Sequence, residues 1–123
     1  MLLKKGMRIV FAGDSVTDDS RSRPEGEGRG NSLGLGYVHM TDAMLTVDYP
    51  ELFIRCTNRG IGGTKMCTEH QHFPAAKDTV QQYIVPQKPD LVTVAYGIND
   101  FHAGTTLDTF LTDYRAYLEE LTD

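Results

Sequence analysis

Residues 9–15 read IVFAGDS: four apolar side chains, a glycine, and then an acidic and a hydroxyl side chain. A short apolar run of this kind is typical of a strand that is buried on both faces. Residues 91–96, LVTVAY, have the same character and predict another such strand. Residues 52–57, LFIRCT, predict a third strand, with Phe53 and Ile54 at its centre. The chain therefore contains three candidate strands, widely separated in sequence.

Apolar residues at helical spacing lie between these strands and after the last one. Three helices are predicted, with apolar positions at Tyr37, Met40, Met44 and Leu45; at Phe73, Ala76, Val80, Tyr83 and Ile84; and at Leu107, Phe110, Leu111, Tyr114, Tyr117, Leu118 and Leu121. A capping-box-like start is predicted at Thr105 and Asp108. Residues 18–36 predict a long loop. The order β-α-β-α-β-α predicts an α/β fold with a parallel sheet, and a flavodoxin-like strand order of 2-1-3 places the first strand in the middle.

Length and composition limit the function. The chain has 123 residues, which fits one domain spanning residues 1–123. Its formal net charge of -5 argues against a nucleic-acid partner, which favours a basic face. No apolar run is long enough to span a membrane. Two cysteines, Cys56 and Cys67, are too few for a disulfide framework, so a cytoplasmic protein with reduced thiols is expected.

Metal and nucleotide cofactors are not expected. The candidate ligands Cys67, Glu69, His70 and His72 match no zinc spacing, and a loop leading into a helix is the simpler interpretation. The turn after the first strand lacks the G-x-G-x-x-G pattern of a dinucleotide site. No cofactor and no metal are therefore predicted.

A small, polar, glycine-bearing cluster follows each predicted strand: residues 13–15 (GDS), 58–63 (NRGIGG) and 97–100 (GIND). Ligands of open parallel sheets bind at the carboxyl ends of the strands, where the strand order reverses. With the order 2-1-3, Ser15 would lie between the other two clusters. A hydroxyl flanked by a backbone N–H and a side-chain amide is what acyl transfer requires. Each cluster alone could be an ordinary turn or helix cap, but their common position favours a catalytic site.

The same clusters resemble the sequence blocks of the SGNH/GDSL hydrolase family. Residues 13–18 (GDSVTD) resemble the block with the nucleophilic serine, residues 58–63 the block with the oxyanion glycine, and residues 97–100 the block with the oxyanion asparagine. By this resemblance Ser15 is the nucleophile, and the Gly60 N–H and Asn99 side chain join the oxyanion hole. The resemblance further implies a three-layer αβα fold, no metal, and small acyl esters as substrates, often acetyl groups on sugars.

The chain departs from the family in one respect. The family's Asp-x-x-His segment, which supplies the base and its orienting acid, does not occur in this sequence. The chain is therefore expected to be truncated before that segment. A base has to come within about 3 Å of the serine hydroxyl. His102, just after Asn99, is a candidate surrogate base, and His70 and His72 are weaker ones.

The sequence thus predicts a serine carboxylester hydrolase that works through an acyl-enzyme intermediate. The alternatives are a catalytically incomplete fragment or non-catalytic small-ligand binding module of the same fold, and a transferase with the same nucleophile. Asp14 and Asp100 are assigned structural, capping roles. Self-association is also predicted, because the third strand lies at an edge of the sheet although its sequence is typical of a central strand.

Overall fold

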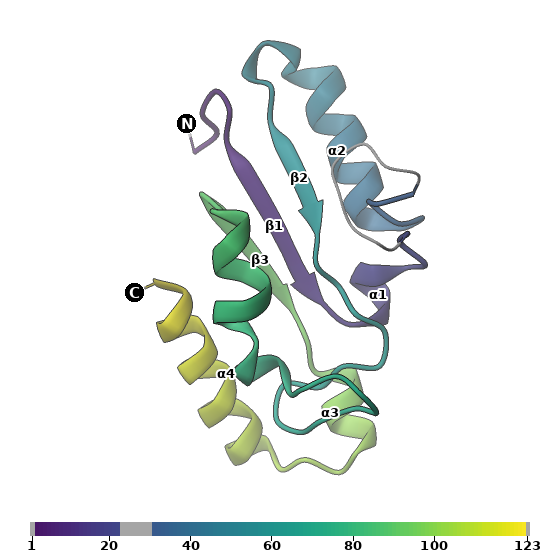
Figure 1. Cartoon of the computed structure of the whole chain (residues 1–123), viewed down its shortest axis with the longest axis vertical. Coiled ribbons are helices and arrows are strands. Elements are labelled where there is room, and N and C mark those ends of the chain that lie inside the picture. Colours follow the sequence, from purple (N-terminus) through teal and green to yellow (C-terminus); the bar gives the residue numbers. More distant parts are fainter. Residues whose placement is uncertain (1, 23–30, 123) are drawn as a thin grey trace.

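Three parallel strands form the centre of the structure, a computed structural model that describes residues 2–22 and 31–122 (Figure 1). The strands are β1 (Arg8–Gly13), β2 (Arg55–Asn58) and β3 (Leu91–Ala95). Their order in the sheet is β2-β1-β3, and both pairings are parallel. This confirms the predicted α/β fold and the predicted strand order.

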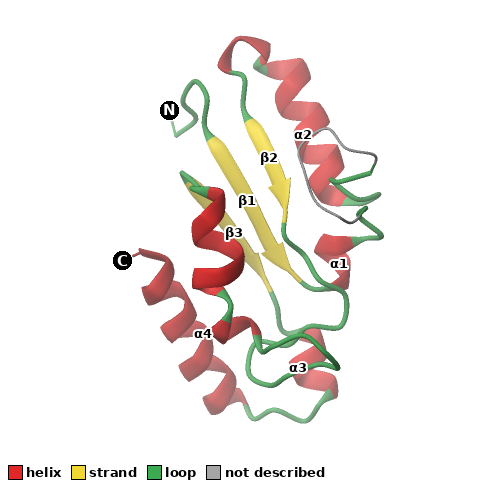
Figure 2. Ribbon diagram, in the orientation of Figure 1, coloured by secondary structure: helices red, strands yellow, loops and turns green. Residues whose placement is uncertain are grey.

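Helices and helical turns connect the strands and cover both faces of the sheet (Figure 2). The elements are α1 (Ser15–Asp18), α2 (Tyr37–Asp48), η1 (Pro50–Leu52), η2 (Ala76–Asp78), η3 (Val80–Ile84), η4 (Val85–Gln87), α3 (Ile98–His102) and α4 (Leu107–Thr122). Helix α2 lies on one side of the sheet, while η2 to η4 and α4 lie on the other (Figure 1). The centre of the predicted long loop, residues 23–30, lies outside the described residues.

The alternation of side chains along β1 explains these layers. Successive residues of a strand point to opposite faces. Ile9 and Phe11 are buried in a cluster with Val38 of α2, whereas Val10 and Ala12 are buried in a cluster with Ile84 of η3. Because both faces of β1 are covered, its four apolar residues form an unbroken run, as the sequence suggested.

The predicted second strand begins later than expected. Residues 50–52 form a 3-10 turn, and Phe53 has a left-handed backbone with a φ of 50°. The Phe53 side chain is 68% exposed and lies under the Lys5 Nζ, which is 5.7 Å from the ring centroid. The prediction that Phe53 is central to a strand is therefore wrong. The adjacent apolar residues Phe53 and Ile54 suggested a strand, but such a pair also occurs next to a tight turn, where one of the two side chains points to solvent.

The predicted helix between β2 and β3 is not a regular α-helix. A 3-10 turn, a π-helical turn and a second 3-10 turn follow one another there, and the Val85 N–H bonds to the Val80 carbonyl oxygen five residues back. Pro86 has no N–H to continue a regular helix, which accounts for the change of pitch at this point. Helix α4 starts one residue later than expected, since its first turn is capped by Thr106, whose Oγ1 accepts from the Thr109 N–H at 3.3 Å.

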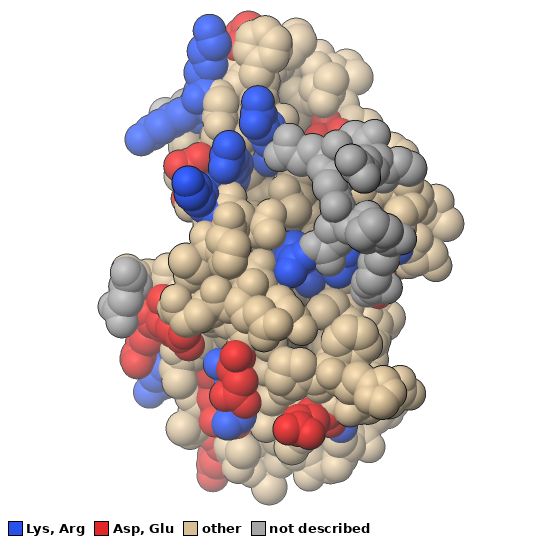
Figure 3. Space-filling view, in the orientation of Figure 1, with Lys and Arg blue, Asp and Glu red and all other residues tan. Residues whose placement is uncertain are grey.

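Charges are unevenly distributed over the face shown in Figure 3: Lys and Arg gather where the strands begin, and Asp and Glu gather over α4. Arg8 and Arg55 are direct neighbours across the β1–β2 pair. Among the described residues, no helix has the length and apolar character needed to cross a membrane. Cys56 and Cys67 are free, buried thiols. The cytoplasmic localisation and the absence of a nucleic-acid partner stay predictions.

We expect the isolated 123-residue chain to self-associate through the exposed edge of β3. A groove along this edge is lined by apolar side chains of Val92, Leu118 and Leu121, and an unprotected strand edge of this kind pairs with other chains. Light scattering at increasing concentration should give a mass above that of a monomer. Leu118→Glu should shift the mass towards the monomer, whereas Leu107→Glu, on an exposed part of the same helix, should not. A monomer at all concentrations would contradict this expectation.

Candidate active site

Ser15 is presented to solvent at the carboxyl end of the central strand. It is the first residue of α1, directly after Asp14, whose Oδ1 accepts from the Val16 N–H at 3.1 Å and so caps this short helix. This contact is the capping role expected for Asp14. The Ser15 side chain is exposed, and its N–H makes no hydrogen bond within the described part of the chain. Ser15 therefore offers both a hydroxyl and a free backbone donor to a ligand.

The segment after β2 is held against α1 by Asn58. The Asn58 Nδ2 donates to the carbonyl oxygens of Thr17, at 2.6 Å, and Leu33, at 2.9 Å. The Asn58 Oδ1 accepts from the Gly60 N–H at 2.9 Å. Asn58 is itself buried. One side chain thus ties the end of β2 to α1 and to the start of the next loop.

Gly60 has a steric role in this arrangement. A Cβ atom on Gly60 would collide with the backbone of Thr17 and Asp18. Its N–H, expected from the sequence to face the oxyanion, is engaged by Asn58 in this conformation. By contrast, the Gly63 N–H has no hydrogen-bond partner among residues 2–22 and 31–122. Gly63 has a φ of +82°. The preceding Gly62 lies beside Ser15, since a Cβ atom on Gly62 would be 3.8 Å from the Ser15 Cβ.

Asn99 lies in the first turn of α3, which follows β3. Its Nδ2 donates to the Thr64 carbonyl oxygen at 3.0 Å. Because a side-chain amide carries two N–H groups, a second donor of Asn99 remains for a ligand. The structure thus joins the third cluster to the loop after β2, and that loop in turn lies against α1.

The four histidines occupy different surroundings. His102 is exposed at the end of α3 and packs edge-on against the exposed Phe101 ring, with centroids 5.7 Å apart. His70 is half-buried, and its ring lies directly against Gly63. Two backbone hydrogen bonds between His70 and Phe73 hold this turn. His72, and His39 on α2, are exposed. The surrogate-base hypothesis stays a prediction for His102, His70 and His72.

Two buried carboxylates adjoin the loop after β2, and neither was singled out for the site from the sequence. Asp18 is 7% exposed and lines an open pocket together with Ser15 and Gly62. Asp100 is 2% exposed, and instead of capping its helix it bonds to the backbone of the loop after β2. The only available sequence signal was position: Asp100 lies in the third polar cluster, and Asp18 ends the block of residues 13–18. Their contacts with the loop depend on the fold.

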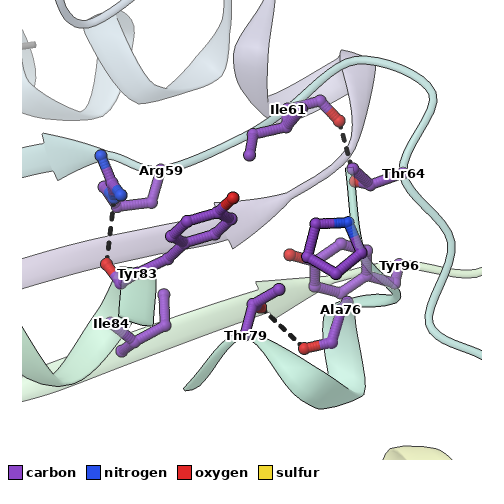
Figure 4. Close-up of a pocket in the computed structure, with 9 residues that line it drawn as sticks. Arg59, Ile61, Thr64, Ala76, Thr79, Tyr83, Ile84 and Tyr96 are labelled. Carbon is purple, nitrogen blue, oxygen red and sulfur yellow. Dashed lines mark hydrogen bonds between the residues drawn. The ribbon is translucent and has the colours of Figure 1, made fainter. Parts of the chain in front are cut away.

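A second, small and partly open cavity lies against this loop (Figure 4). It is lined mainly by apolar or aromatic side chains, among them Ile61, Tyr83 and Tyr96. The polar groups at its wall bond to neighbouring backbone: the Arg59 Nε donates to the Tyr83 carbonyl oxygen at 3.0 Å, and the Thr64 Oγ1 to that of Ile61 at 2.8 Å (Figure 4). The contacts around this cavity therefore belong to the packing beneath the loop.

Neither thiol is set up as a competing nucleophile. Burial, together with the nearby Asp42 carboxylate, raises the pKa of Cys56 to about 12. Burial and a contact with Asp113 raise the pKa of Cys67 to about 12. Thiols with a raised pKa are protonated and unreactive near neutral pH. In the part of the chain that the structure describes, no three His, Cys, Asp or Glu side chains gather in a way that could hold a metal ion.

Comparisons with known proteins show which proteins share this sequence pattern and fold. The GDSL-like lipase/acylhydrolase family matches residues 11–123. An acetylxylan esterase from Geobacillus stearothermophilus is 38% identical over 120 residues, which cover 98% of this chain and 51% of that protein. A catalytic mutant of an acetylxylan esterase from the same organism superposes with a TM-score of 0.83 at 33% identity, covering 99% of this chain and 57% of that chain. A GDSL-like lipase structure from Parabacteroides merdae superposes with a TM-score of 0.82 at 29% identity, covering 96% and 54%. The chain thus spans about half the length of these relatives.

We expect both cysteines to be inert in the native protein. At pH 8, well below a thiol pKa of about 12, the reaction with 5,5′-dithiobis(2-nitrobenzoate) should be about a hundredfold slower than in denaturant, where the pKa returns to its usual range. Cys56→Ser and Cys67→Ser variants assign any reaction to one thiol. Rapid stoichiometric reaction of either thiol in the native protein would contradict this expectation.

Proposed function

The chain belongs to the GDSL-like lipase/acylhydrolase family, and from this premise we propose that it carries the nucleophile and the oxyanion donors of a carboxylester hydrolase. The observation that carries the proposal is the exposure of Ser15 at the carboxyl end of the central strand, beside Gly62 of the neighbouring loop. A hydroxyl held there by a capped helix can reach a bound ester from the open side. The reaction is attack by the Ser15 Oγ on the ester carbonyl, with an acyl-enzyme as the intermediate.

The negative charge that develops on the carbonyl oxygen requires hydrogen-bond donors fixed in advance. We assign this role to the N–H of Ser15, to the free amide N–H of Asn99, and to the backbone N–H of Gly63. Gly63 replaces Gly60 in this proposal because the Gly60 N–H is already bonded to Asn58. Gly60 instead allows the loop to approach α1 closely enough to lie next to Ser15.

A serine hydroxyl is a weak nucleophile unless a neighbouring base takes its proton and a third group orients that base. The acetylxylan esterase of G. stearothermophilus has been solved as catalytic mutants of a serine, an aspartate and a histidine residue. An Asp-x-x-His pair is absent from the present sequence. We therefore propose that residues 1–123 are the N-terminal part of a single hydrolase domain, whose base and acid come from a further C-terminal segment.

The proposed substrates are small acyl esters, and acetyl groups on carbohydrates are the favoured class. This rests on the acetylxylan esterases that resemble the chain. The missing Asp-x-x-His pair favours one second candidate, a non-catalytic module that binds such ligands in the same crevice. The two differ in whether Ser15 can be acylated.

Asn99→Ala should lower turnover without unfolding the protein. The test uses an extended protein in which residues 1–123 are followed by the part of the G. stearothermophilus acetylxylan esterase that comes after its matched region. Loss of one oxyanion donor typically lowers turnover by about a hundred- to a thousandfold. Thermal melting of the variant should stay close to that of the unmodified extended protein. A drop of less than about threefold would remove Asn99 from the oxyanion hole.

The isolated chain should hydrolyse p-nitrophenyl acetate slowly, and the extended protein should hydrolyse it at enzymatic speed. Without a base, a serine hydrolase retains only about a thousand- to ten-thousandfold rate enhancement over water. Ser15→Ala should abolish the activity of the extended protein, while Thr112→Ala, which removes an exposed hydroxyl on α4, should not. His102→Ala and His70→Ala in the isolated chain test the surrogate bases. Full activity of Ser15→Ala in the extended protein would overturn the proposed function.

A further inference from the structure

We infer that Asp18 and Asp100 are positioning residues that clamp the loop from Gly60 to Cys67 from its two sides. They would so set the position of the Gly63 N–H, which follows directly on the Gly62 that lies beside Ser15. The inference rests on the proposed function in assigning that N–H to the oxyanion hole. The clamp itself rests on hydrogen bonds of the structure alone. Neither carboxylate is proposed to touch the substrate, so both act through the loop.

Asp18 holds the first part of the loop. Its Oδ2 accepts from the Gly62 N–H at 2.7 Å, a short distance typical of a bond to a charged acceptor. Its Oδ1 accepts from the Arg21 N–H at 3.3 Å, and the Arg21 Nε donates to the Gly60 carbonyl oxygen at 2.7 Å. Asp18 and Arg21 are both buried. Two residues that follow the nucleophile therefore fix both Gly60 and Gly62.

Asp100 holds the second part of the loop. Its Oδ2 accepts from the Met66 N–H at 2.9 Å, and its Oδ1 from the Cys67 N–H at 3.0 Å. The adjacent Asn99 donates to the Thr64 carbonyl oxygen. The turn after β3 therefore bonds to the loop backbone at three residues, Thr64, Met66 and Cys67. The same turn supplies the proposed side-chain donor, so the place of Asn99 and the path of the loop are set together.

The free Gly63 N–H lies between the residue that Asp18 holds, Gly62, and the first residue held by the turn after β3, Thr64. The loop contains three glycines, Gly60, Gly62 and Gly63, and a glycine-rich backbone has many accessible conformations. Only a donor fixed before the reaction stabilises the developing charge well, and a shift of about 1 Å can cost about a hundredfold in rate. A buried carboxylate is also costly unless hydrogen bonds satisfy it. Backbone N–H groups of the loop bond to both oxygens of Asp100 and to one oxygen of Asp18, whose other oxygen accepts from the Arg21 N–H. The carboxylates and the loop therefore stabilise one another.

Hydrogen exchange of the 123-residue chain tests the clamp without any need for activity. Asp18→Asn should speed exchange of the Gly62 amide about tenfold or more, and Asp100→Asn should do so for the Met66 or Cys67 amide, because a neutral amide is a weaker acceptor than a carboxylate. Asp90→Asn is the matched control: the Asp90 Oδ2 also accepts a backbone N–H, that of Arg8 at 2.8 Å, at the opposite end of the sheet. This variant should leave exchange of the loop unchanged.

Kinetics of the extended protein test the consequence for the site. Asp18→Asn and Asp100→Asn should each lower kcat for p-nitrophenyl acetate about tenfold or more, with KM changed less than about twofold, and Asp90→Asn should change neither. Faster loop exchange with an unchanged kcat would overturn the positioning role. Unchanged loop exchange in both folded variants would overturn the clamp, whatever the kinetics show.

The two inferences fail in different ways. If the unmodified extended protein shows no activity that depends on Ser15, the proposed function fails, and the exchange of the Gly62, Met66 and Cys67 amides still decides the clamp. Since the two carboxylates lie on separate elements, α1 and α3, one folded variant suffices if the other does not fold. In that case exchange is compared at the loop amides that the remaining carboxylate holds.

Discussion

The parallel pairing of β1 with both β2 and β3 is the constraint on which the rest of this structure depends. Parallel strands end at the same edge of a sheet. The turns that follow β1, β2 and β3, although far apart in sequence, therefore start next to one another (Figure 1). β1 and β3 approach closely at their carboxyl ends. Gly13, which pairs with Ala95, has no room for a side chain between Thr17 and the Ala95 carbonyl oxygen. This close fit starts α1 directly against the sheet and brings Ser15 to the edge where the other two turns arrive.

Much of this arrangement could be predicted from the sequence because it depends on periodicity and strand ends. The unbroken apolar runs of β1 and β3, and the polar clusters that follow the strands, required no tertiary information. Phe53 could not be placed, because an apolar side chain next to a turn is compatible with either a strand or an exposed left-handed residue. The engagement of Gly60 by Asn58 and the contacts of Asp100 could not be predicted either, because both are side-chain bonds to backbone that only the folded loop brings near.

The proposed reaction needs two sets of groups, a nucleophile with its oxyanion donors and a base with its orienting acid, and residues 1–123 carry candidates for the first set. The proposed attacking hydroxyl and the proposed oxyanion donors lie on the turns after β1, β2 and β3, where hydrogen bonds between these turns hold them. The proton acceptor of a serine hydrolase must reach the same hydroxyl from outside these turns, and the described histidines are either exposed or packed on Gly63. A site prepared in this way stabilises charge on a bound ester but needs a base to generate the nucleophile. The loop from Gly60 to Cys67 is therefore central to the proposed site, because it bonds both to α1 and to the turn after β3.

Labelling with a fluorophosphonate probe tests the central claim, that Ser15 is the nucleophile of this site, most directly. The probe reacts covalently with a serine only when its hydroxyl is activated. Mass spectrometry of the labelled extended protein should place the adduct on Ser15, and the isolated chain should label far more slowly. An adduct on another residue, or hydrolysis of the ester by an extended protein whose Ser15 stays unlabelled, would contradict the account.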